Sequence, residues 1–131
     1  MTWTIYEFLN IRGQGIIEIW VQEERLQKAA IAQLNLKIDL LEQSGPDLSP
    51  KLLAGTGQRH IYKLRIHVPK MQLRPLLCRG PIAPHEEFTL LLGAIERNRK
   101  LEPANALTVA ETNRQTVLAD QHRRRRHEHH F

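Results

Sequence analysis

The sequence contains one cysteine, Cys78, few aromatic residues (5%) and no long hydrophobic run. A single cysteine excludes an internal disulfide and leaves too few thiols for a cysteine-built zinc site, which favours a reducing cytoplasm. No apolar segment approaches the ~18 residues that a membrane-spanning helix needs. The N-terminus has polar and charged residues where a secretion signal would have its apolar region. We therefore expect a cytoplasmic protein that does not associate with a membrane.

The sequence also lacks the patterns of three kinds of functional site. Residues 12–15 (Arg-Gly-Gln-Gly) lack the third glycine and the lysine that a nucleotide-binding loop requires. The two serines, Ser44 and Ser49, lie in loop sequence without a nucleophile-elbow pattern, which excludes serine hydrolysis. Tyr62 is the one aromatic residue of the most basic segment, so a platform that stacks single-stranded RNA bases is not expected.

The charge that is present is concentrated in the middle of the chain. Residues 51–100 contain 10 Lys or Arg and 3 Asp or Glu, while the 131-residue chain as a whole has a net charge of +5. A positive field of this kind attracts phosphate, most often on nucleic acid, or an acidic protein. The length and the 41% content of hydrophobic residues are those of one globular domain, which we place at residues 1–120.

Periodicity predicts an α+β fold in the order β-α-α-β-β-β-α, with a curved, mainly antiparallel sheet packed against helices. Expected elements, in chain order, are a strand over 2–8, a kinked helix or helical pair over 16–44 that breaks near 22–24, strands over 60–68, 72–79 and 87–95, and a helix opened by Pro103. Residues 46–58 are expected to form a loop, and residues 96–100 a charged turn. Residues 121–131 have almost no apolar side chains to bury, which predicts a disordered basic His/Arg tail.

Several short segments resemble the RelE/ParE toxin superfamily, and most closely its phage-derived HigB-like branch. The resemblance is carried by Leu-Leu-Ala-Gly at 52–55, Ile-Tyr-Lys-Leu-Arg-Ile at 61–66, Arg74, Leu-Leu-Gly at 91–93, and a basic turn, a proline and a helix with Ala110 and Arg114. The order of elements extends it to about nine-tenths of the chain, although residues 3–45 match in length and pattern only. Pro75, Ala94 and the missing threonine before Pro103 depart from the family pattern.

The resemblance implies a small RelE-like domain that is the toxin of a toxin–antitoxin pair. Such a toxin is a ribosome-dependent, metal-independent endoribonuclease that cuts mRNA, needs no cofactor, and is neutralised by a cognate antitoxin, often of the helix-turn-helix type. Two alternatives stay open. In the first, the chain is a catalytically inactive, toxin-like protein of phage origin that serves as a binding or adaptor protein. In the second, it is an inhibitor of DNA gyrase.

Metal-independent RNA cleavage needs groups that transfer protons and cations that neutralise the phosphorane. Lys63, Arg65 and His67 alternate along one strand and should face the same side. The candidate catalytic residues are Arg65, His67, Arg74, Arg97 and Arg99, and the candidate RNA-binding residues are Lys63, Arg79 and Lys100. We expect these side chains to converge in one concave pocket that binds anions. The alternative is that these charged residues have no catalytic role and are only the solvated face of a half-exposed antiparallel sheet.

The other histidines of the chain are not expected to take part in catalysis or RNA binding. His60 and His85 are expected to be solvated, and the four histidines of the tail lack the rigid scaffold that a metal site needs. No metal is therefore expected. Arg123–Arg126 are instead expected to add nonspecific affinity for phosphate.

Overall fold

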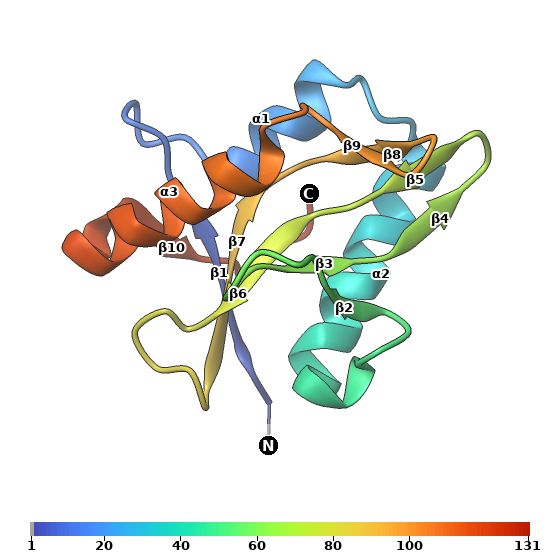
Figure 1. The fold of residues 1–131 in the computed structure, drawn as a ribbon. Helices are drawn as coiled ribbons and strands as arrows, with labels where there is room; N and C mark the ends of the chain where they lie inside the picture. The colour runs from blue at the N-terminus through green and yellow to red at the C-terminus, as the bar shows by residue number, and fades with distance from the viewer. Residues whose placement is uncertain (1) are drawn as a thin grey trace.

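The computed structural model describes residues 2–131 and has a mixed α+β fold with three α-helices in that range (Figure 1). The helical elements are α1 (Ile16–Glu23), α2 (Lys28–Ser44), the 3₁₀ helix η1 (Gly45–Leu48), α3 (Ala106–Ala119) and the 3₁₀ helix η2 (Gln121–Arg123). The strands are β1 (Thr4–Phe8), β2 (Leu53–Gly55), β3 (Tyr62–Leu64), β4 (Ile66–Val68), β5 (Met71–Leu73), β6 (Leu76–Arg79), β7 (Glu87–Leu92), β8 (Ile95–Arg97), β9 (Lys100–Glu102) and β10 (Arg124–Arg126). None of the helices in this range is both long and apolar enough to cross a bilayer.

The strands form two sheets that share three chain segments. One sheet has the order β10-β1-β7-β6-β3-β2 and the other the order β4-β5-β8-β9. Among the described strands, β1 and β7 are the only parallel neighbours, and all other pairs are antiparallel. The chain passes from one sheet to the other at Arg65, at residues 74–75 and at residues 93–94.

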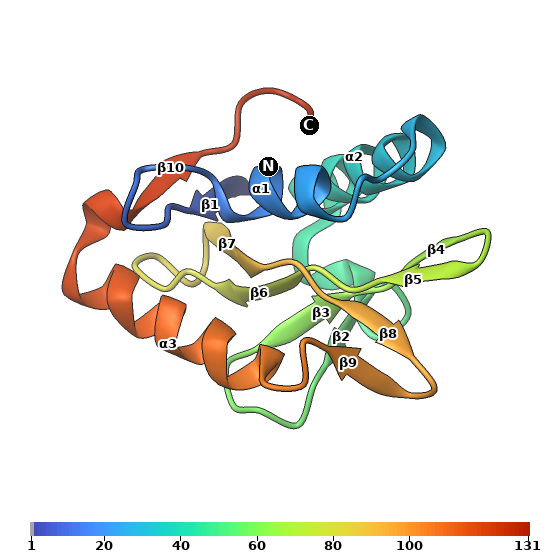
Figure 2. The ribbon, with the colours of Figure 1, turned by 90° about the horizontal axis from the view of Figure 1, so that it is seen from above.

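Backbone hydrogen bonds continue across these passages. Leu64 N donates to Pro75 O (3.0 Å), and Arg74 N donates to Ala94 O (2.8 Å). Pro75 has no N–H to donate, and its place at the bend removes it from the regular ladder. The two sheets thus act as one surface that bends along this line (Figure 2).

Helices cover both faces of the six-stranded sheet, with α1 and α2 on one side and α3 on the other (Figure 2). The face toward α1 and α2 is filled by large side chains such as Leu34, Ile38 and Phe88. Helix α3 presents small residues, Ala106 and Ala110, each fully buried. Because alanine projects only a methyl group, α3 can lie close to the sheet. It leaves the four-stranded part of the bent surface uncovered (Figure 2).

The main elements lie where the periodicity predicts them. The helical region is interrupted between Glu23 and Lys28, close to the expected break, and the stripe of Leu26, Ala30, Leu34, Ile38 and Leu41 is buried as the spacing predicts. The strand predictions over 60–68, 72–79 and 87–95 coincide with the three segments that cross the bend.

Elsewhere the expected order is incomplete. Strand β2 lies within the expected loop 46–58, and residues 96–100 belong to a β8–β9 hairpin instead of a simple turn. The strands β2, β8 and β9 have three residues each, which is too short for alternation to be recognisable in the sequence.

The expectation of a disordered tail over 121–131 is wrong. Strand β10 pairs antiparallel with β1, with Phe8 opposite Arg124. Arg124 forms an ion pair with buried Glu87, and Arg125 forms one with buried Glu7. The tail has few apolar groups, but its guanidinium groups neutralise carboxylates in the body of the fold, and this orders it.

Candidate functional site

The bent surface brings a row of polar side chains together on its uncovered face. His67 on β4 lies opposite Gln72 on β5, and Gln72 lies opposite Glu96 on β8. Opposed residues in neighbouring strands share a face of the sheet. Arg74 is two residues beyond Gln72 and Lys63 four before His67, so alternation assigns both to this side.

Hydrogen bonds and ion pairs join these side chains in one chain of contacts. Gln72 Nε2 lies 2.7 Å from His67 Nδ1, and Arg74 Nη2 donates to Gln72 Oε1 (3.0 Å). Arg74 Nε lies 3.5 Å from Glu96 Oε1, and Lys63 Nζ donates to the same oxygen (3.3 Å). We refer to Lys63, His67, Gln72, Arg74 and Glu96 as the Lys63–His67 network.

The network sets the tautomer of the histidine. A guanidinium can only donate, so Arg74 directs the amide oxygen of Gln72 toward itself and the amide NH₂ group toward His67. The Nδ1 atom of His67 must then accept a hydrogen bond from this NH₂ group, so the proton of the neutral imidazole lies on Nε2. His67 is exposed, which leaves its Nε2–H group available to a ligand.

Arg74 is largely internal. Its residue is 7% exposed, and its Nη1 also donates to Leu73 O (2.9 Å). Its Nε is buried and has the ion pair with Glu96 but no hydrogen bond of regular geometry. Arg74 is therefore placed to orient Gln72 and Glu96, and its guanidinium offers little surface to a bound phosphate.

Glu96 is the carboxylate of the network. Partial burial, the largest single influence, raises the pKa of this carboxyl, but the hydrogen bonds and positive charges of Lys63 and Arg74 outweigh it. The net result is a pKa below the ordinary value, and the group is ionised at neutral pH. Its Oε1 takes both cationic contacts, so Oε2 is the oxygen left to accept from a ligand.

Arg65 lies between Lys63 and His67 at the bend between β3 and β4. Its backbone N–H donates to Leu52 O (2.8 Å), while its side chain is exposed. The neighbours Leu64 and Ile66 are buried, as strict alternation predicts, so Arg65 projects from the same side as Lys63 and His67. Within residues 2–131 its guanidinium has no carboxylate partner.

Three other predicted residues lie on the β8–β9 hairpin, outside the network. Arg97 is adjacent to Glu96 along β8 and so faces the opposite side, where it forms an ion pair with Glu102. Lys100 is directly opposite Arg97 and shares that side. Arg99 is in the turn, with a φ of 63°.

Arg79 is also separate from the network. It ends β6, its Nε donates to Pro84 O (3.2 Å), and its guanidinium lies 5.5 Å from the ring centre of Trp3. The expectation of one pocket formed by all eight residues is therefore wrong. The fold joins Lys63, His67 and Arg74, with Arg65 beside them, and disperses the other four.

Gln72 and Glu96 were not expected in the site. Neither residue type stands out in the sequence, and only the register of β4, β5 and β8 aligns the two with His67. That register depends on the bend, which no local pattern specifies.

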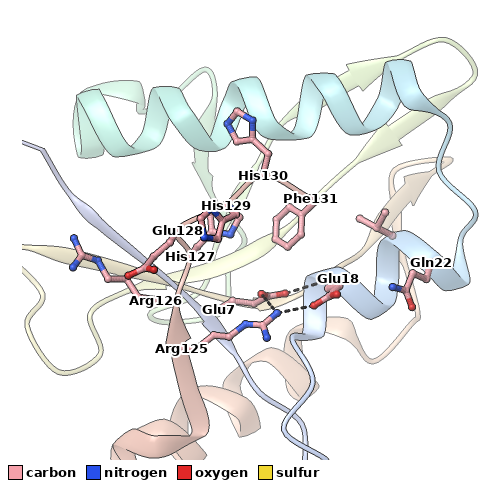
Figure 3. Close-up of a pocket in the computed structure, with 11 residues that line it drawn as sticks. Glu7, Glu18, Gln22, Arg125, Arg126, His127, Glu128, His129, His130 and Phe131 are labelled. Atoms are coloured by element: carbon pink, nitrogen blue, oxygen red, sulfur yellow. Dashed lines mark hydrogen bonds and ion pairs between the residues drawn. The ribbon is translucent and has the colours of Figure 1, made fainter.

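A cavity of about 510 Å³ lies on the other side of the molecule, beneath the C-terminal tail (Figure 3). Arg125 spans its floor between Glu7 (3.3 Å) and Glu18 (2.6 Å), and Phe131 closes it above. Burial is the main influence on Glu7 and raises the pKa of its carboxyl, although Ile17 N and Glu18 N donate to it. These contacts connect the tail to the start of α1 and are structural.

The tail contains His122, His127, His129 and His130. Across residues 2–131, no group of three or more His, Cys, Asp or Glu side chains is arranged to hold a metal ion. His130 is instead paired with Asp39 on α2 (2.9 Å).

Comparison with known proteins identifies no relative: no family model matches the chain, and neither a curated protein nor a solved structure matches it at a significant level.

Proposed function

We propose that this chain is the toxin of a toxin–antitoxin pair and cleaves mRNA at the ribosome through the Lys63–His67 network. The proposal rests on the motifs that resemble the RelE/ParE superfamily, together with one structural observation. That observation is the hydrogen-bonded row on the uncovered face of the sheet, which combines an ionised carboxylate, an imidazole and exposed Arg65.

The chemistry assigns a role to each accessible group. Glu96 Oε2 accepts the proton of the ribose 2′-hydroxyl, whose oxygen attacks the phosphorus. Arg65 and the His67 Nε2–H group bind the phosphoryl oxygens and offset the charge of the phosphorane. The bond from phosphorus to the 5′-oxygen breaks, solvent protonates the leaving oxygen, and Glu96 then releases its proton to solvent. The products are a 2′,3′-cyclic phosphate and a free 5′-hydroxyl.

Arg74 and Lys63 act as positioning residues in this scheme. Both hold Oε1 of Glu96, and Arg74 in addition fixes Gln72 and through it the imidazole. An antitoxin that neutralises the protein in the cytoplasm would need only to cover Arg65 and His67, since both project from the open face.

The decisive experiment is induction of the chain in a bacterial host, with growth and the 5′ ends of mRNA followed together. The unmodified chain should stop growth and produce mRNA cut at defined codons. Arg65→Ala, His67→Ala and Glu96→Gln should each reduce cleavage on the order of 100-fold or more. Arg59→Ala, His85→Ala and Glu86→Gln replace exposed residues of the same types outside the network and should cleave normally.

Other outcomes contradict the proposal and identify an alternative. Growth arrest with intact mRNA and damaged DNA indicates inhibition of gyrase. Absence of arrest, with the folded chain present at a comparable level, indicates a binding or adaptor protein. Purified chain that cuts naked mRNA as fast as ribosome-bound mRNA contradicts the requirement for the ribosome.

A further inference from the structure

A groove of about 520 Å³ lies between α1, the passage from β7 to β8, and the end of β9. These elements lie together at the top of the molecule in Figure 1. The groove is separate from the Lys63–His67 network, because its rim residue Glu102 lies on the opposite side of the β8–β9 hairpin from Glu96.

The floor of the groove is apolar. Ile16, Ile19 and Leu92 line it and are only partly buried, and the indole of Trp20 lies against the backbone of Gly93. A second hollow adjoins it along the β1–α1 loop; it is lined mainly by polar residues but includes Ile11, which is 89% exposed. A groove with an apolar floor and a large exposed apolar side chain close by is typical of a protein-binding site.

The rim of the groove is acidic, in contrast to the rest of the molecule. Glu23, Glu24 and Glu102 line it, and none of the residues that line it is cationic, although Arg12 lines the adjoining hollow. Arg97 pairs with Glu102 from outside, whereas Glu23 and Glu24 have no ion pair within residues 2–131. The chain as a whole has a net charge of +5, so the groove has the opposite sign of charge from the protein as a whole.

We propose that this groove binds a segment of a partner protein whose apolar side chains are flanked by Lys or Arg. The apolar floor would take the hydrophobic anchors, and Glu23 and Glu24 would pair with the flanking cations. The acidic rim repels phosphate, which excludes RNA as the occupant.

Within residues 2–131, a second copy of this chain offers no cluster of exposed apolar side chains flanked by cations. The exposed large apolar side chains apart from Ile11, within residues 2–131, are Leu36, Ile82 and Leu118, which lie singly on different elements. The basic tail is already paired with β1.

The test is a titration of the full chain with two labelled synthetic helical peptides, followed by fluorescence anisotropy. One peptide has leucines on one face and lysines on the other, and the second has glutamates in place of the lysines. The leucine–lysine peptide should bind about tenfold tighter or more. Nonspecific attraction to a chain of charge +5 favours the acidic peptide, so this preference can arise only from a local acidic site.

Variants locate the binding site. Glu23→Lys/Glu24→Lys should weaken binding of the lysine peptide about tenfold, and Ile11→Gln should weaken binding of both peptides. Asp47→Lys/Glu86→Lys makes the same change of charge at exposed positions outside the groove and should bind as the unmodified chain does. Ile11 is almost fully exposed, so its replacement leaves the fold intact.

Three results would overturn the proposal. The first is equal affinity for the two peptides, and the second is an equal effect of the two charge-reversal pairs. The third is a dimer of the free chain, measured by sedimentation, that Ile11→Gln dissociates, since the groove is then an interface between copies.

Discussion

Arg124 and Glu87 form a buried ion pair that joins the last strand to the centre of the six-stranded sheet. Their side chains are 6% and 8% exposed. Arg124 Nη2 donates to Glu87 Oε1 (3.2 Å), Nη1 donates to Thr89 Oγ1 (3.1 Å), and the guanidinium lies 3.6 Å from the ring centre of Tyr6. A residue of an apparently unstructured tail therefore neutralises a charge in the core.

Removal of one partner of this pair should be far more costly than removal of both. Arg124→Met leaves the Glu87 carboxylate buried without a counter-charge, and it should lower the free energy of unfolding by about 3–5 kcal/mol. Arg124→Met/Glu87→Met removes both charges and should recover most of that loss. Urea denaturation measures both. Arg126→Met, at an exposed position of the same strand, should change stability by less than about 0.5 kcal/mol; an equal loss for all three variants would contradict the assignment.

The C-terminal end of the tail should detach as the pH falls. Burial is the main cause that lowers the pKa of His127, and the positive charges of His130, Arg125 and His129 add to it against Asp39. The imidazole therefore binds a proton more readily when the tail is released than when it is docked. Docking has its full stability above the ordinary pKa of about 6.5 and becomes weaker as the pH falls below that value.

Trypsin cleavage within the arginine-rich tail measures this release. Cleavage should accelerate as the pH is lowered from 7.5 toward 6, after correction for the activity of trypsin on a small substrate. His127→Gln should abolish the acceleration, because glutamine does not titrate. His122→Gln changes an exposed histidine of the same tail and should retain it. A pH profile that is the same in all three proteins would show that His127 does not control the docking.

The fold was predictable as far as its signals were local. The helical break close to residues 22–24, the buried stripe of α2 and the three long strand segments follow from the periodicity of the apolar residues. β10 was not predictable, because the carboxylates that hold it, Glu7 and Glu87, lie more than 30 residues from it in sequence. A run of arginines and histidines has the composition of a disordered tail unless the partners in the fold are known.

The candidate site likewise has a part that local patterns predict and a part that they do not. Alternation was enough to assign Lys63, Arg65 and His67 to one side of a strand. It was not enough to show that Arg97 faces away from Glu96, because the expected charged turn is a regular hairpin. Arg74 came from the resemblance and lies in the network, but its burial makes it a positioning residue.

The proton of His67 should move when its support is removed. Gln72→Met takes away the amide that donates to Nδ1, so the imidazole should change from the Nε2–H tautomer to a mixture of both. Long-range ¹H–¹⁵N correlation spectra above pH 8 distinguish the tautomers directly. Gln58→Met, in the loop before β3, should leave the His67 spectrum unchanged. A wild-type spectrum with the proton mainly on Nδ1 would contradict the orientation that Arg74 imposes on Gln72.

Gly93 should tolerate no side chain, because the indole of Trp20 occupies the space that a Cβ would need. Gly93→Ala pushes the buried ring, which is 8% exposed, away from the passage between β7 and β8. The free energy of unfolding should fall by about 1–3 kcal/mol, and the emission of Trp20 should shift as its environment changes. Gly55→Ala is the matched control, since an added Cβ meets no atom within 4 Å there, and its stability should stay within about 0.5 kcal/mol of the unmodified chain. If the two alanine variants are equally stable, Trp20 does not pack on Gly93, and the floor of the groove beside α1 has a different shape.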